Sequence, residues 1–384
     1  MLTHEIGSHV SWKRWPSRVW CLALLVVFAA RPATALVSTS VVSPTAGNAT
    51  ASGTTLRNAL SAISSPSSTN PWLVKVEPGI YDIGTTALPM RSWVDIEGSG
   101  IGVTIIRGTV DVTASPSGGT VNGASDAELR LLTVEAIGTS TIPHVAAVLN
   151  DSAFPRLYRV KAVAQGTTGS LVYGIRNLSS GPRIEECEIS ATSTGSGSIA
   201  YGVAYKNSFS GSRSVILRSQ ISASAASTTY GISMLDRLTL SELRDSAIGV
   251  ANASTNYGIY AAQNTAWSGQ EALNIRNTEV SAAGGSSSYG VHFTSTSWAY
   301  VDIAVSRIWG HVASTNNYGI YHYGGGAAIV QGSNIVGSTA TVEVSGNAMI
   351  TSTELNGGAS SAGGWMGCAG VWDESVTFYN NTCP

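Results

Sequence analysis

The chain has 384 residues, a formal net charge of −2 at pH 7, and charged side chains at only 11% of its positions. This charge balance excludes a nucleic-acid-binding protein, which needs a basic stripe. Gly, Ser, Thr and Ala are abundant, but Ile, Val and Leu recur at regular intervals and supply enough apolar surface for a core, which excludes a disordered chain.

Residues 1–35 have the pattern of a secretory signal peptide. Three basic residues precede a short apolar run at 19–30, and an A-x-A cleavage site ends at Ala35. The run is shorter than the about 20 residues of a membrane span; an uncleaved anchor is the alternative. Cleavage would leave 17 basic and 22 acidic residues and no membrane span. We therefore expect a secreted protein, located extracellularly, at the cell surface or in the periplasm.

Residues 36–53 are interpreted as a linker, and a short helix is predicted over 54–63. Leu56, Leu60 and Ile63 would share one face of that helix behind a threonine cap. Such a helix can cover an open end of a stack of strands, whose edges need protection.

Two short sequence motifs recur together between the predicted helix and about residue 365. Tyr-Gly-Ile or Tyr-Gly-Val occurs at intervals of 27 to 32 residues and begins at Tyr173, Tyr201, Tyr230, Tyr257, Tyr289 and Tyr318. A pair of apolar residues five apart, such as Ile184 and Ile189, accompanies it. A fixed period of this length is typical of a solenoid, a propeller or another repeat array.

The two motifs are too short and too rich in β-branched residues to form helices. Each repeat is too short for the four strands of a propeller blade. The sequence therefore predicts an all-β fold, a right-handed parallel β-helix (solenoid) over 54–365, with one coil per repeat. Since Tyr and Ile stand two apart, they would share one face of a strand, with Gly allowing a close approach.

Stacked coils turn equivalent positions into columns. The residue three after the first apolar member of each pair belongs to a column of small, inward residues. This column includes Cys187, which is expected to be a buried, inert thiol. Two outward columns mix acids with bases, which indicates charge pairing between coils; a hydrolase would instead need two facing carboxylates.

The tail over 366–384 contains Cys368 and Cys383. An exported protein can keep a disulfide, so this pair is predicted to be bonded and to close the C-terminal end of the helix.

Aromatic residues crowd into the last coils. Residues just after the inward Ile point outward, so Tyr260, His292 and Tyr321 are predicted to stack on one exposed face. The candidate carbohydrate-binding residues are Tyr260, His292, Trp298, Trp309, Tyr321 and Tyr323. Packing against loops or against a neighbouring chain is the alternative.

No tight ligand spacing is present among the histidines, so no metal and no cofactor is expected. A Ser-His-Asp set that uses Asp302 and His311 stays open, because serines are everywhere in the sequence.

The stretches "WLVKVEPGIYDIG" (72–84) and "WVDIEGSG" (93–100) resemble the opening coils of pectin methylesterases and of uncharacterised secreted bacterial proteins in the pectin lyase-like superfamily. The resemblance implies a right-handed parallel β-helix and a link to polysaccharides. The catalytic sequence motifs of the esterases, hydrolases and lyases of this superfamily are missing from the chain.

The preferred hypothesis is a secreted scaffold that binds a polysaccharide, a cell-surface glycan or another surface partner without catalysis. The alternatives are a polysaccharide-active lyase, hydrolase or carbohydrate esterase with a divergent site, and an adhesive surface protein that uses its Ser/Thr loops.

Overall fold

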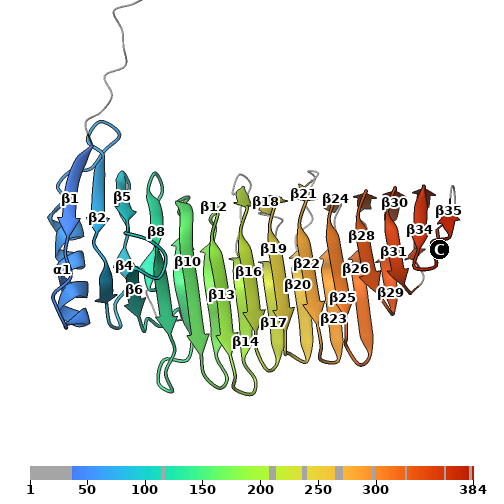
Figure 1. The fold of residues 1–384 in the computed structure, drawn as a ribbon, viewed down its shortest axis with the longest axis horizontal. Helices are drawn as coiled ribbons and strands as arrows, with labels where there is room; N and C mark the ends of the chain where they lie inside the picture. The colour runs from blue at the N-terminus through green and yellow to red at the C-terminus, as the bar shows by residue number, and fades with distance from the viewer. Residues whose placement is uncertain are drawn as a thin grey trace, which may run out of the picture. The chain divides into compact units, whose positions relative to one another are not determined.

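The structure, a computed structural model, describes residues 37–113, 118–206, 213–235, 240–263, 271–295, 299–324, 327–358, 360–379 and 383–384. The predicted fold is confirmed: the chain from Val37 onward is an all-β, right-handed parallel β-helix with a helix near its start and a disulfide near its end. In Figure 1 the strands lie side by side in chain order, from α1 in blue to β35 in red.

The coils build three faces, which we call face 1, face 2 and face 3. The long strands β8 (Glu128–Ile137) and β10 (Arg156–Gly166) run through both face 1 and face 2. The other strands of face 1 are β1 (Ser38–Val42), β2 (Trp72–Val76), β5 (Val94–Glu97), β12 (Arg183–Glu185), β15 (Ser214–Leu217), β18 (Leu240–Arg244), β21 (Glu271–Arg276), β24 (Ala299–Ala304), β27 (Ala327–Gln331), β30 (Asn347–Thr351) and β33 (Met366–Ala369).

Face 2 continues each coil beyond a corner. Its strands are β3 (Gly79–Asp82), β6 (Thr104–Gly108), β13 (Glu188–Ser193), β16 (Gln220–Ser224), β19 (Ala247–Ala251), β22 (Glu279–Ala283), β25 (Arg307–His311), β28 (Asn334–Gly337), β31 (Glu354–Gly357) and β34 (Val371–Asp373), which pairs antiparallel with β35 (Phe378–Tyr379).

Face 3 is a separate sheet of 11 strands. It consists of β4 (Leu88–Pro89), β7 (Val121–Asn122), β9 (Val145–Asp151), β11 (Leu171–Leu178), β14 (Ile199–Lys206), β17 (Thr228–Leu235), β20 (Thr255–Gln263), β23 (Ser287–Ser295), β26 (Asn316–Gly324), β29 (Ala340–Val344) and β32 (Ser361–Ala362).

The motif of two apolar residues five apart, such as Ile184 and Ile189, spans two strands and the corner between them. The residue two after its first apolar member has a left-handed backbone, with φ of 53° at Glu186, 47° at Arg218 and 53° at Asp245. This conformation turns the chain from face 1 to face 2 and interrupts the sheet. Backbone groups at the corner therefore need other hydrogen-bond partners.

A column of buried hydroxyl groups supplies those partners. The Ser219 N–H donates to Ser246 Oγ (3.1 Å), and that hydroxyl donates to the Arg244 carbonyl (2.8 Å). The same two bonds recur at Thr278 and Ser306. Cys187 begins this corner ladder, and its thiol donates to the Glu185 carbonyl at 3.2 Å. Cys187 is free and buried, as predicted, and burial raises its pKa to about 12.

The triplets lie on face 3, and the prediction that Tyr and Ile share a side of the strand is wrong. Ile232 is fully buried in the core, whereas the ring of Tyr230 lies outside and stacks on the triplet tyrosines of adjacent coils. A Cβ at Gly231 would point inward, under 3.0 Å from Ile248 and from the Gly258 carbonyl. Gly and Ile are therefore consecutive inward positions, which breaks the alternation of a regular strand.

The N-terminal end is covered by α1 (Ala49–Ala62), which begins five residues before the predicted start. Its cap is Asn48, whose side chain accepts from the Ala51 N–H at 2.9 Å, and not a threonine. Leu56 and Leu60 are buried as expected. The expected linker 36–53 contains β1, which pairs with β2.

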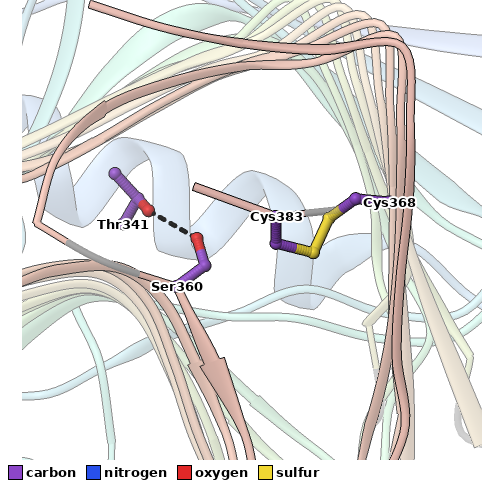
Figure 2. Close-up of a disulfide and its surroundings, with 4 residues drawn as sticks. All are labelled: Thr341, Ser360, Cys368 and Cys383. Atoms are coloured by element: carbon purple, nitrogen blue, oxygen red, sulfur yellow. Dashed lines mark hydrogen bonds between the residues drawn. A yellow bond between two sulfur atoms is a disulfide. The ribbon is translucent and has the colours of Figure 1, made fainter. Parts of the chain in front are cut away.

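The C-terminal end carries the predicted disulfide. Cys368 on β33 is bonded to Cys383, with 5.4 Å between the Cα atoms. Figure 2 shows the bond beside the hydrogen bond between Thr341 and Ser360, which measures 2.8 Å. Cys383 packs on the core, and the Ser360 N–H donates to the Pro384 carbonyl at 3.1 Å.

Candidate functional site

Six tyrosine rings stack along the outer surface of face 3. Each triplet places its tyrosine over that of the preceding coil, and successive ring centroids are 4.7 to 5.2 Å apart, with planes within 13° of parallel. Burial raises the pKa of Tyr230 to about 12, so its phenol is protonated at neutral pH. We call this column the tyrosine ladder; it runs over Tyr173, Tyr201, Tyr230, Tyr257, Tyr289 and Tyr318.

A second column of rings lies beside the last half of the ladder. Tyr260 pairs in register with His292, and His292 with Tyr321, as the sequence predicts for this stack. The ring of Tyr260 is tilted by 57° to that of Tyr257, and the ring of Tyr321 by 62° to that of Tyr318. Both tyrosines are half-buried. They therefore present their rings differently from the ladder, whose ring faces cover one another.

His292 is not an exposed member of this column. Only 9% of the residue is accessible, because its ring lies against Tyr257 and Tyr289 with centroids 5.2 and 4.7 Å apart. Burial lowers the pKa of His292 to about 4, so the ring is neutral near pH 7. Nδ1 has no hydrogen-bond partner within the described part of the chain. His292 therefore packs between the tyrosine rings and does not form part of the exposed surface.

Tyr323 is the most open ring of the group, with 64% of its surface exposed. It follows Tyr321 by two residues on β26 and thus shares its side of the strand. In the next coil, Glu343 lies in register with Tyr321. The exposed part of the candidate site therefore consists of Tyr260, Tyr321 and Tyr323, with Glu343 at its edge.

Trp309 lies elsewhere. It projects outward from β25 on face 2, whereas an inward Cβ at Gly290 on face 3 would meet the backbone of Trp309 and the side chain of Ile308. Faces 2 and 3 thus pack against each other through the core, and their outer surfaces point in opposite directions. Trp298, the remaining candidate, lies outside the described residues.

Sequence reasoning missed the ladder as part of the site. The predicted shared face with the inward Ile puts the triplet tyrosines in the scaffold, yet Tyr257, Tyr289 and Tyr318 contact the tilted rings directly. The six-fold repetition of a tyrosine beside a glycine was the signal that could have identified them.

The acidic residues of faces 1 and 2 are mostly engaged with bases of the next coil. Lys161 Nζ lies 2.9 Å from Glu188 Oε2, and Arg156 Nη2 lies 2.6 Å from Glu185 Oε2. Hydrogen bonds from Arg183 and Arg156 lower the pKa of Glu185. Carboxylates held in this way already have partners. They stabilise the stacking of coils and are poorly suited to act as general acids.

In the described segments, no group of three or more His, Cys, Asp and Glu side chains could hold a metal ion. A search of the same segments for a helix long and apolar enough to cross a membrane gives no candidate.

No protein-family model and no curated protein matches the sequence. The chain is similar to the A-module of mannuronan C-5 epimerase AlgE4 from Azotobacter vinelandii, with 12% identity and a TM-score of 0.46 over 85% of this chain and 89% of that chain. It is similar to the Dettilon tailspike protein, with 13% identity and a TM-score of 0.41 over 86% of this chain and 64% of that chain. It is also similar to pectin methylesterase PemA from Erwinia chrysanthemi, with 12% identity and a TM-score of 0.31 over 90% of this chain and 85% of that chain. At identities of 12% to 13%, these similarities concern the fold alone.

Proposed function

We propose that this protein is a secreted β-helical scaffold that binds a polysaccharide or cell-surface glycan on the outer surface of face 3, without catalysis. The observation that carries the proposal is the tilted pair of half-exposed rings, Tyr260 and Tyr321, next to the exposed ring of Tyr323. Secretion rests on the signal-peptide pattern of residues 1–35.

These rings suit a sugar for two reasons. The apolar side of a pyranose ring packs on an aromatic ring, while the phenol hydroxyl hydrogen-bonds to neighbouring sugar hydroxyls. Tyr321 and Tyr323, two residues apart on a strand, have Cα atoms about 7 Å apart. Adjacent units of one chain can therefore contact both rings. Glu343 adds a hydrogen-bond acceptor beside Tyr321.

The rigidity of the ladder supports binding. Tyr257, Tyr289 and Tyr318 are held by stacking on their neighbours, so the tilted rings rest on a preformed surface. Preorganised rings lose little conformational entropy when a ligand binds.

The absence of a catalytic role is inferred from the ion pairs of faces 1 and 2, in which acids such as Glu185, Glu186 and Glu188 are already engaged with bases. A divergent polysaccharide-active enzyme is therefore the less favoured hypothesis, and the experiment below includes its products.

The test is co-sedimentation of the purified protein with a panel of plant and microbial polysaccharides, together with assays for reducing ends, unsaturated ends and released methanol. We expect binding without product. Tyr260→Ala, Tyr321→Ala and Tyr323→Ala should each weaken binding, whereas Tyr158→Ala on face 1 is the matched control and should not. Product formation, or equal binding by all variants, would reject the proposal.

A further inference from the structure

A shallow trough crosses the outer surface of face 2, on the side of the β-helix away from the aromatic rings of face 3. It has a volume of about 370 Å³ and continues into a second depression of about 550 Å³. Ala247 and Gly249 of β19 lie in its floor, between β16 and β22.

Gly249 has no structural reason to be a glycine. Its φ is not positive, and β19 stays in continuous register with β16 and β22, so there is no bulge. A Cβ at this position would meet nothing within 4 Å, in contrast to the crowded glycines of face 3. Glycine inside a strand weakens the strand and often marks a place where a ligand or another backbone comes close. The open floor at Gly249 therefore points to an occupant.

An aromatic side chain lies one strand beyond the lining of the trough. The register neighbours of Gly249 are Ser222 and Ser281, and the next residue of this column is Trp309. The indole is half-buried, and its Nε1–H is buried without a hydrogen-bond acceptor among the residues that the structure describes. Trp309 therefore places an aromatic side chain next to Ser281, just beyond the trough.

Charged groups along the trough balance one another. At the far end, Lys161 and Glu188 form an ion pair of 2.9 Å. Closer to Trp309, Glu279 and Arg307 lie in register. The structure records no ion pair of either side chain with a described residue, so both have hydrogen-bonding capacity to spare. With Arg218 and Asp245 of the second depression, three positive and three negative side chains line the trough, a balance that favours a neutral ligand over a polyanion.

The backbone of face 2 offers an extended peptide no free strand edge on which to pair. The strands β16, β19 and β22 each pair with a neighbour on both sides, so their N–H and C=O groups are used within the sheet. A peptide lying on the trough would therefore gain no main-chain hydrogen bonds from the sheet. Sugar hydroxyl groups can bond instead to side chains such as Glu279 and Arg307, and the indole can pack on a sugar ring.

We infer that this trough is a second binding site, which takes a short neutral glycan chain lying along the axis of the β-helix between the Lys161–Glu188 pair and Trp309. Five strand spacings separate β10 from β25, a distance of about 24 Å, which accommodates an oligosaccharide of several units. The inference is independent of the aromatic rings of face 3.

The test is calorimetric titration of the purified protein with neutral hexasaccharides (cellohexaose, xylohexaose, mannohexaose, maltohexaose and chitohexaose) and with acidic hexagalacturonate. Gly249→Val fills the floor of the trough, and because the added atoms point into open space, the melting temperature should not fall. Arg307→Gln removes one polar wall. Asn356→Val, in the same column beyond Trp309, is the matched control.

We expect at least one neutral hexasaccharide to bind, Gly249→Val and Arg307→Gln to raise its Kd about tenfold or more, and Asn356→Val and Tyr321→Ala to leave it unchanged. Binding of hexagalacturonate alone, binding of no hexasaccharide, or wild-type affinity in Gly249→Val would overturn the inference. Loss of binding only in Tyr321→Ala would do so too, while supporting the site on face 3.

Discussion

The glycine of the Tyr-Gly-Ile triplet offers the sharpest test of how the coils pack. In Gly231→Ala, the new methyl group would lie under 3.0 Å from Ile248 Cγ2 and from the Gly258 carbonyl oxygen. The isoleucine is part of the buried core, and the carbonyl belongs to the backbone of the adjacent strand. Neither atom can move away without disturbing the coils that it joins.

Overpacking of this kind costs 1–3 kcal/mol, and because a backbone atom is involved we expect the upper end, about 3 kcal/mol. The matched control is Gly249→Ala on the outer surface of face 2, where a Cβ meets nothing within 4 Å. That variant should be unchanged or about 0.4–1 kcal/mol more stable, since alanine restricts the unfolded chain.

The assay is urea unfolding followed by far-UV circular dichroism, with the three proteins compared at one concentration and pH. Gly231→Ala should unfold at a clearly lower urea concentration than the wild type, and Gly249→Ala at the same or a higher one. If the two variants unfold at the same urea concentration, the triplet glycine is not selected for its lack of a Cβ, and our account of the repeat fails.

Three further predictions concern the corner ladder, the disulfide and the buried histidine. Ser246→Ala leaves the Ser219 N–H without its acceptor, which should lower the free energy of unfolding by about 1–3 kcal/mol; a loss below 0.5 kcal/mol in urea unfolding would contradict this. Cys383→Ser opens a loop with a separation of 15 residues, worth about 3 kcal/mol, and hydrogen exchange should speed up in β30 to β34 but not in β10 to β13. Because the pKa of His292 is lowered from 6.5 to about 4 in the folded protein, the unfolded chain binds the proton more readily, so this residue removes stability as the pH falls from 6.5 to 4. His292→Phe should flatten the decline of the urea midpoint over that range, and an unchanged slope would show that other groups cause it.

The sequence predicted the coils well because their spacing is imposed by stacking. Every coil must place its inward aliphatic residue over that of the previous coil. Ile184, Ile216 and Leu243 therefore lie in register, as the recurring apolar pairs predict. The corner column of Cys187 and the serines was predictable for the same reason, since the equivalent position recurs in every coil.

The errors arose where backbone geometry departs from the regular strand. Alternation placed Tyr230 inside, but Gly231 and Ile232 occupy two consecutive inward positions. The helix α1 begins five residues before the predicted threonine cap. It includes Gly53, where a Cβ would collide with the Asp82 carbonyl, so close packing requires the glycine.

The candidate site was only partly predictable because outward positions are free of the constraint that shapes the core. Trp309 and Tyr321 are close in sequence, and both belong to the aromatic-rich last coils. They nevertheless lie on opposite surfaces, since the chain turns from face 2 to face 3 between them. Sequence proximity could not reveal this, and neither could it reveal the burial of His292.

The corner ladder also bears on how such a protein changes length during evolution. Each hydroxyl accepts from one adjacent coil and donates within its own, so every coil offers the same hydrogen-bonding groups to the coil on either side. Deleting or duplicating one whole repeat would therefore rejoin the ladder with no donor or acceptor left over, and the glycine and tyrosine columns would rejoin with it. In such an architecture the number of repeats can vary by genetic duplication, while the helix at one end and the disulfide at the other are retained as fixed termini.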